Sequence, residues 1–237
     1  THPASSYYSN AIQIEEGKSW TDFLTEQEAA NELTFALAAD SINPTPGTIT
    51  DFSFLQSLPL KFQVTLIVDD SHGIGWMGKN GEGIVSAFQL PGNIELLLNF
   101  SLSKAYHINA GAVCGSQKWI DLVKQHVNFT TSTPPMPALA YAWLRAPTIF
   151  EQQRNFLHQN IQYLQKLLLG VTFATNGGTP VFVIHKQSVA QYLFQNNLII
   201  SSFSYPRPES NAINRVVVNA LHQKTDLQKL VHCLKQV

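Results

Sequence analysis

The sequence has little charge. Only 13% of its 237 residues are Asp, Glu, Lys or Arg, and the formal net charge is −1. Without a run of Lys or Arg, nucleic acids and acidic membranes are poor candidates as partners, because clustered positive charge binds both. No apolar run approaches the roughly 20 residues needed to cross a bilayer. So sparse a charge predicts that part of the surface is buried in an oligomer.

Cysteine is nearly absent as well. Cys114 and Cys233 stand far apart in unrelated contexts. This excludes a disulfide scaffold and is typical of a reducing compartment, so a cytoplasmic protein is expected. Cys114 lies among small apolar residues and is predicted to be a buried thiol. The first residues, THPAS, do not resemble a signal peptide, and the lack of an initial Met suggests that residues are missing upstream.

Apolar residues are plentiful, at 44% of the chain. In the first part of the chain, apolar runs alternate with helical patterns. Strands are predicted at 33–39, 64–68, 95–100 and 110–114, and helices at 51–60 and 116–126. Residues 64–68 are apolar apart from Thr65, which is typical of a parallel strand covered on both faces. The alternation predicts an α/β sheet, wholly or mostly parallel.

The pattern changes after Pro134-Pro135. Two helices are predicted at 138–144 and 149–169, the second long and amphipathic. Further strands are predicted at 171–174, 180–184, 198–201 and 215–219, and further helices at 188–195 and from about 225. We therefore expect one domain over residues 1–147 and a small α/β domain with its own sheet over residues 148–237.

The densest candidate for chemistry is VDDSHGIG, residues 68–75. Asp69 stands at the C-terminal end of a predicted strand, where ligands bind in open α/β sheets. A carboxylate there is costly unless it faces a cation or several donors, and His72 is close enough to share a ligand. A polar turn in which Asp69 caps local amides is one interpretation. A metal site is another, weakened by the absence of a further ligand cluster.

A dinucleotide loop is a third interpretation, because Gly73, Gly75 and Gly78 match G-x-G-x-x-G. It is rejected, since that fingerprint must open a helix directly and here a glycine-rich loop continues to Gly83. The second candidate is the segment NFSLSKA, in which Lys104 follows an apolar strand and two hydroxyls. A single lysine there is usually a surface residue. Its pairing with the upstream strand, Asp and His makes a shared site the better hypothesis.

Together these segments resemble the α-oxoamine synthase branch of the fold-type-I enzymes that use pyridoxal 5'-phosphate (PLP). That branch includes 8-amino-7-oxononanoate synthase and 2-amino-3-ketobutyrate CoA ligase. Its strand end reads V-D-D-A-H-G-x-G and its lysine segment T-F-S-K-A, where this chain has VDDSHGIG and SLSKA. The segments AGAVCGSQKWIDLV, FTTSTPPMPALA and RVVVNALHQKTDL also match. Their order and approximate spacing hold from about residue 33 to the end.

The resemblance implies an α/β PLP-dependent transferase, the aminotransferase fold type I. Residues 1–147 would be the C-terminal portion of its PLP-binding large domain. Lys104 would form a Schiff base with the PLP aldehyde, Asp69 would pair with the pyridine nitrogen, and His72 would hydrogen-bond the phenolic oxygen. An acid beside that nitrogen favours its charged form, which makes the ring an electron sink.

The same resemblance places hydroxyls around the phosphate. Ser101 occupies the phosphate-contacting position, and Ser103 is expected to bind the cofactor as well. Ser132 and Thr133 would reach the phosphate bound to a neighbouring subunit, which implies a homodimer with composite active sites. His2 stands where the family has a histidine that stacks on the cofactor ring, although a terminus without such a role is an almost equal alternative.

The implied reaction is the transfer of an acyl group from acyl-CoA to the α-carbon of an amino acid. Lys104 would shuttle the α-proton, and Arg215 would clamp the substrate carboxylate in bidentate fashion, unless it is an ordinary strand-end arginine. An aminotransferase, or a non-catalytic scaffold protein, is the alternative. Three departures from the family pattern bear on the acyl-CoA substrate. Residues 106–110 stand where the family has a glycine-rich stretch. Pro44 stands where a serine is common, and Pro206 replaces a substrate-contacting threonine.

Overall fold

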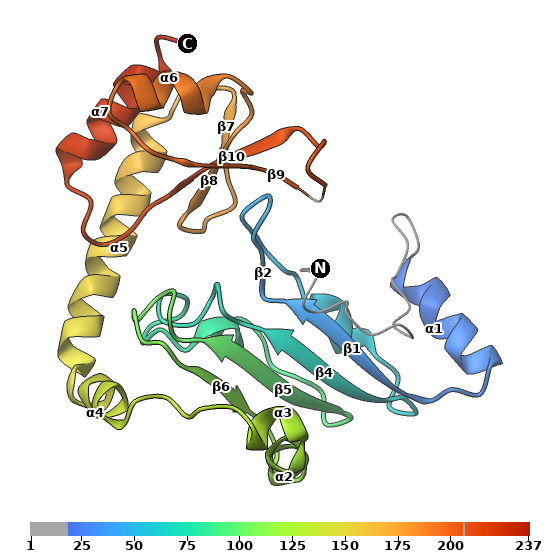
Figure 1. Ribbon diagram of the computed structural model, residues 1–237. Coiled ribbons are helices and arrows are strands. Elements are labelled where there is room, and N and C mark those ends of the chain that lie inside the picture. The colour runs from blue at the N-terminus through green and yellow to red at the C-terminus, as the bar shows by residue number, and fades with distance from the viewer. Residues whose placement is uncertain (1–18, 206) are drawn as a thin grey trace. The chain divides into compact units, whose positions relative to one another are not determined.

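The computed structural model describes residues 19–205 and 207–237 (Figure 1). The chain divides into two compact units. The first comprises Thr50–Ala146 and the described residues up to Ser41; the second comprises Ile42–Ile49 and Pro147–Val237. The sequence pattern did not predict that Ile42–Ile49, which lies within the first part of the chain, groups with the second unit.

The first unit is built on a four-stranded sheet of order β1-β4-β5-β6. Its strands are β1 (Thr34–Asp40), β4 (Gln63–Asp69), β5 (Ile94–Ser101) and β6 (Gly111–Cys114). β1, β4 and β5 run parallel, and β6 runs antiparallel to β5. The expected mostly parallel sheet is confirmed. β6 is the exception because the link from Ser101 to Gly111 is too short for a crossover connection.

The core of this unit follows the alternation of β4. Val64, Leu66 and Val68 are buried, because successive side chains of a strand point to opposite faces. The helix expected at 51–60 is wrong: a short 3₁₀ helix, η2 (Ser53–Ser57), forms instead. The Asp51 carboxylate accepts hydrogen bonds from the Ser53 amide and hydroxyl, a local turn of the kind that competes with a regular helix. A second 3₁₀ helix is η3 (Gly83–Ser86).

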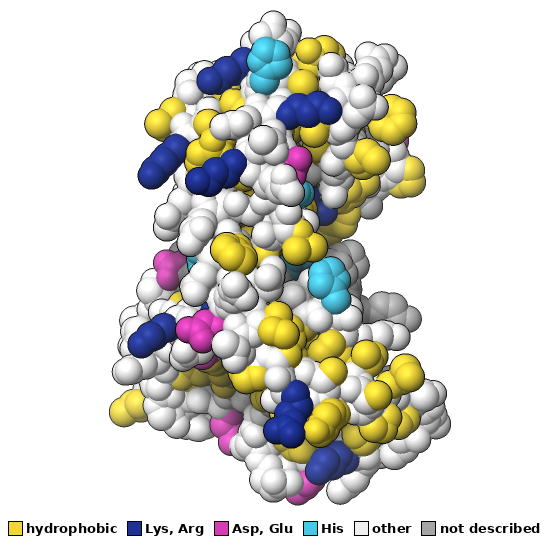
Figure 2. Space-filling view, turned by 90° about the vertical axis from the view of Figure 1, so that its left-hand side faces the viewer, with side chains coloured by type: hydrophobic (Ala, Val, Ile, Leu, Met, Phe, Trp, Pro, Cys, Tyr) yellow, Lys and Arg dark blue, Asp and Glu magenta, His cyan; other side chains and the backbone are white. Residues whose placement is uncertain are grey.

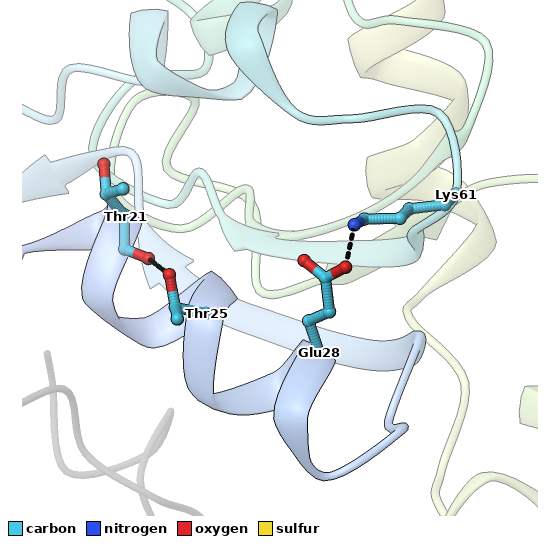
Figure 3. Close-up of polar contacts among 4 residues, drawn as sticks. All are labelled: Thr21, Thr25, Glu28 and Lys61. Carbon is cyan, nitrogen blue, oxygen red and sulfur yellow. Dashed lines mark hydrogen bonds and ion pairs between the residues drawn. The ribbon is translucent and has the colours of Figure 1, made fainter.

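Helix α1 (Trp20–Ala29) was not predicted, and it lies beside β1. The rings of Trp20 and Phe23 contact Phe35 of β1, with centroids 6.3 and 5.4 Å away. Figure 3 shows an ion pair between Lys61 and Glu28 at the other end of the helix. Exposed ion pairs contribute about 1 kcal/mol at most, so the aromatic contacts hold α1 in place.

Three helices follow the sheet: α2 (Gln117–Gln125), α3 (Val127–Thr130) and α4 (Pro137–Arg145). None of the three contains a buried residue. Their exposed apolar side chains, here called the α2–α4 surface, are Leu122, Val127, Phe129, Tyr141 and Leu144, with Met136 of the α3–α4 link. Figure 2 shows hydrophobic side chains gathered over this unit. Cys114 is also exposed. Its prediction as a buried thiol is wrong, because β6 is an edge strand.

The second unit is an α/β unit with an antiparallel sheet of order β7-β8-β10-β9. The strands are β7 (Ala174–Asn176), β8 (Val181–Ile184), β9 (Ser201–Ser204) and β10 (Ala212–Val217), and the helices are α5 (Pro147–Leu167), α6 (Val189–Gln195) and α7 (Lys224–Leu234). One core joins the helices to the sheet through Leu164, Phe182, Leu193 and Leu234, all nearly fully buried. Arg215 lies in β10, inside this unit.

A hairpin of β2 (Ile42–Asn43) and β3 (Thr48–Ile49) packs against the sheet of the second unit. The Thr179 hydroxyl donates to the Gly47 carbonyl at 2.8 Å. Gly47 has a φ of 67°, and a Cβ there would lie 3.0 Å from the Val181 side chain. The turn therefore needs glycine for its backbone conformation as well as for space. Among the described residues, no helix is both long and apolar enough to span a membrane.

Candidate active site

The C-terminal ends of β4 and β5 lie side by side, as the register pairs Asp69 with Asn99. The half-buried Asp69 accepts a hydrogen bond from the Ser71 amide at 2.9 Å. In turn, the Ser71 hydroxyl accepts one from the Ser101 amide at 2.9 Å. The turn after β4 is thus tied to the end of β5, and the two candidate segments meet at one edge of the sheet.

Lys104 and His72 come together at this edge. The Lys104 Nζ lies 2.9 Å from the His72 Nε2. Lys104 is exposed and His72 is half-buried, so a small molecule can reach the amine. The Trp76 indole donates to the His72 carbonyl at 2.6 Å and fixes the backbone of the turn. Two of the residues singled out in the sequence are therefore direct neighbours in the structure.

Two hydroxyls accompany them. Ser101 Oγ and Ser103 Oγ are 2.6 Å apart, and either atom can donate. The Ser103 amide also donates to Ser101 Oγ at 3.2 Å. The edge therefore presents an amine, an imidazole, a carboxylate and a hydroxyl pair within the first unit.

The glycine-rich loop after His72 opens no α-helix, which agrees with rejecting a dinucleotide loop. Gly75 has a φ of 91°, and a Cβ there would lie 2.6 Å from the Ala105 side chain. The loop thus approaches the backbone beside Lys104 closely. Asp69 does cap a local amide, as the polar-turn interpretation expected. Among the described residues, no group of three or more His, Cys, Asp or Glu side chains could hold a metal ion.

The segment at residues 106–110 contains no glycine and still turns tightly. Leu102 anchors it, because its amide donates to the Ala110 carbonyl and its carbonyl accepts from the Tyr106 and Ile108 amides. His107 takes a φ of 54°, a conformation that costs a residue with a side chain about 1–2 kcal/mol. The Tyr106 ring packs edge-on against Trp143 at 5.7 Å. These aromatic rings fix the turn that carries Lys104.

Sequence reasoning missed the role of Asp70. Its side chain is completely buried at the same edge. The alternation of β4 carries the signal: Val64, Leu66 and Val68 face the core, and Asp70 continues that register. Asp69 faces the other way. The two adjacent acids therefore have different environments.

The remaining predicted residues lie elsewhere. Ser132 and Thr133 are exposed in the link between α3 and α4, and the Ser132 hydroxyl donates to the Asn128 carbonyl. β6 runs back along β5, and the Trp119 indole of α2 donates to Glu95 near the start of β5. Helix α2 therefore begins near the edge of the sheet opposite Lys104. His2 and Pro206 lie outside the described residues.

Arg215 is half-buried in the second unit. Its guanidinium donates to the Pro44 carbonyl and stacks over the Phe203 ring, 4.7 Å from the centroid. Burial lowers the pKa of Arg215 below its usual value. Pro44 thus serves Arg215 through its backbone oxygen.

Comparison with known proteins identifies relatives over most of the chain. The family model "Aminotransferase class I and II" matches residues 18–234. An 8-amino-7-oxononanoate synthase of Coprothermobacter proteolyticus is 31% identical over 86% of this chain and 55% of its own length. The same enzyme of Thermosipho melanesiensis is 29% identical, over 85% and 54%. The chain thus spans about half the length of these relatives.

Solved structures share the fold. An 8-amino-7-oxononanoate synthase from Francisella tularensis superposes with a TM-score of 0.69 at 22% identity, covering 90% of this chain and 65% of the other. A serine palmitoyltransferase from S. paucimobilis with bound PLP–myriocin aldimine gives 0.73 at 18% identity, covering 86% and 54%. The expected fold type I is confirmed. With its family model matched almost from end to end, the chain belongs to the class I and II aminotransferase family.

Proposed function

We propose that this chain carries the cofactor-binding lysine of a PLP-dependent acyltransferase of the oxoamine synthase type. The observation that carries the proposal is the 2.9 Å contact between Lys104 Nζ and His72 Nε2, beside Asp69 on the adjacent strand end. In this proposal, residues up to 147 belong to the PLP-binding large domain and residues 148–237 form the small domain. We also propose that the protein is cytoplasmic, because both cysteines are free thiols, as is usual in a reducing compartment.

The chemistry of the donors fits PLP. The Lys104 amine can condense with the aldehyde. The Asp69 carboxylate can pair with the pyridine nitrogen, and the His72 imidazole can hydrogen-bond the phenolic oxygen. Ser101 and Ser103 offer hydroxyls for the phosphate. When bound, PLP supplies an electron sink for a carbanion at the amino-acid α-carbon. In this proposal, Lys104 would move the α-proton, and His72 would orient the lysine amine.

Acyl transfer is favoured over amino transfer by the relatives, which carry the names of oxoamine synthases. The proposed substrates are an amino acid, with its carboxylate on Arg215, and an acyl-CoA. The experiment supplies the purified chain with PLP, amino acids and acyl-CoA and measures carbon dioxide release. Release that requires acyl-CoA supports acyl transfer. Amino transfer to a keto acid would replace it with the aminotransferase alternative, and a chain that ignores added PLP would support the scaffold alternative.

A homodimer with composite sites is part of the proposal. The α2–α4 surface exposes apolar side chains, and Ser132 and Thr133 lie in the α3–α4 link within it. Large apolar side chains exposed in such number are typical of interaction sites. Leu144 is 70% exposed on this surface, and Leu60, 75% exposed, lies outside it.

Leu144→Asp is expected to weaken self-association in sedimentation analysis, because it places a charge in the apolar contact. Leu60→Asp, a substitution of matched exposure, should leave self-association unchanged. A wild-type chain that remains monomeric while active would refute the composite site.

A further inference from the structure

Asp70 makes more connections than any role assigned so far explains. It has no exposed surface. Its Oδ2 accepts a hydrogen bond from the Ile84 amide at 3.0 Å, and its amide donates to the Asn99 carbonyl at 2.8 Å. Its carbonyl accepts from the Gly73 and Ile74 amides at 3.0 and 2.9 Å. One residue thus joins the turn after β4, the end of β5 and the start of η3.

Two glycines make room for this carboxylate. A Cβ on Gly73 would lie 2.1 Å from Asp70 Oδ1, and a Cβ on Gly83 would lie 1.8 Å from Oδ2. Both distances are shorter than any non-bonded contact, so only glycine fits at either position. The loop is closed around the acid on two sides, so a side chain at Gly73 or at Gly83 would displace the Asp70 carboxylate.

The burial of this acid is unfavourable in itself. Desolvation raises the pKa of Asp70 and the nearby Asp69 adds to that rise, while the Ser41 hydroxyl and the Ile84 amide oppose it. Among the described residues, Oδ1 has no hydrogen-bond partner of good geometry. A buried carboxylate without a cation costs free energy. Stability alone therefore does not account for an acid at this position.

We propose that Asp70 is a positioning residue of the cofactor site, holding the turn that presents Asp69 and His72. This inference rests on the proposed PLP site. Asp69 and His72 flank Asp70 closely in sequence, and His72 contacts Lys104. If the Ile84 anchor is lost, the turn is free to change conformation, and the imidazole leaves the lysine amine. In this proposal the two adjacent acids have different roles: Asp69 would pair with the cofactor, and Asp70 holds the backbone of the turn.

The decisive variant is Asp70→Ala, compared with Asn93→Ala. Asn93 is also buried in the first unit and holds the Phe62 and Pro59 carbonyls, but it precedes β5 at the opposite end of the strands. Asp70→Ala is expected to raise the Kd for PLP roughly 10–100-fold, as loss of a supporting residue does at other sites. Asn93→Ala should lower thermal stability and leave the Kd unchanged. Equal Kd values for both variants would overturn the proposal.

Asp70→Asn provides the conservative rescue. Its amide oxygen can accept from the Ile84 amide, so PLP affinity should return to within a few-fold of wild type.

The pH dependence of stability should change in Asp70→Asn as well. Folding raises the pKa of Asp70, so the protonated carboxyl group favours the folded state. The contribution of Asp70 to the free energy of unfolding is therefore present below pH 3.8 and is lost as the pH rises through the raised pKa. Thermal unfolding of Asp70→Asn should lack this loss.

Hydrogen exchange separates this proposal from the proposed function. In the chain without PLP, Asp70→Ala should speed amide exchange in residues 71–75 and at Ile84, and leave the middle of β5 protected. If wild type fails to bind PLP but Asp70→Ala still exchanges faster than wild type at these amides, the proposed function fails while the anchoring stands. Unchanged exchange in Asp70→Ala would refute the anchoring itself.

Discussion

The Lys104→Ala variant is expected to lose covalent PLP attachment completely. Only a neutral primary amine can condense with the aldehyde, and Lys104 is the lysine that meets His72 at 2.9 Å. Wild type mixed with PLP and reduced with borohydride should yield a single modified peptide, the one that contains Lys104. The variant should yield none, with catalytic turnover lost along with the adduct.

Lys79→Ala is the matched control. Lys79 is exposed in the loop of the same site, yet it follows no strand end. Free PLP in large excess modifies surface lysines, so the reaction uses PLP equimolar with the chain, and the control tells a specific adduct from a general one. Modification that is lost in Lys79→Ala, or that spreads evenly over lysines in wild type, would remove Lys104 from its proposed role.

Among the variants proposed for the first unit, Gly83→Ala should show the largest decrease in the free energy of unfolding. Its Cβ would lie 1.8 Å from the Asp70 carboxylate, and the residue has a φ of 78°. Overpacking and the left-handed conformation together should lower the free energy of unfolding by about 2–5 kcal/mol. Urea unfolding followed by fluorescence measures this, and the PLP affinity should fall in parallel, because the added methyl group pushes Asp70 from its place.

Gly92→Ala serves as the comparison in the same unit. A Cβ on Gly92 would meet no atom within 4 Å. Its effect should stay within about 0.5 kcal/mol, as is usual for surface substitutions. Comparable losses in the two variants would mean that the space around Asp70 is not the cause.

The sequence by itself determined the order of most elements and pointed to the two segments of the candidate site. The apolar run before Asp69 predicts a parallel strand, and the matching run before Ser101 predicts its neighbour. Strands that run parallel bring their C-terminal ends to one edge. The meeting of His72 and Lys104 could therefore be anticipated from local patterns. Helix α5 was equally visible, because a long amphipathic period is a strong signal.

Only the tertiary structure decided the remaining features. It grouped Ile42–Ile49 with the second unit, turned β6 antiparallel, and left Cys114 exposed on an edge strand. It also buried Asp70 while leaving its neighbour Asp69 half-exposed. Each of these outcomes depends on contacts between residues distant in the chain, such as Asp70 with Ile84 or Thr179 with Gly47. Local propensity and periodicity carry no information about such contacts, because they act only between near neighbours in sequence.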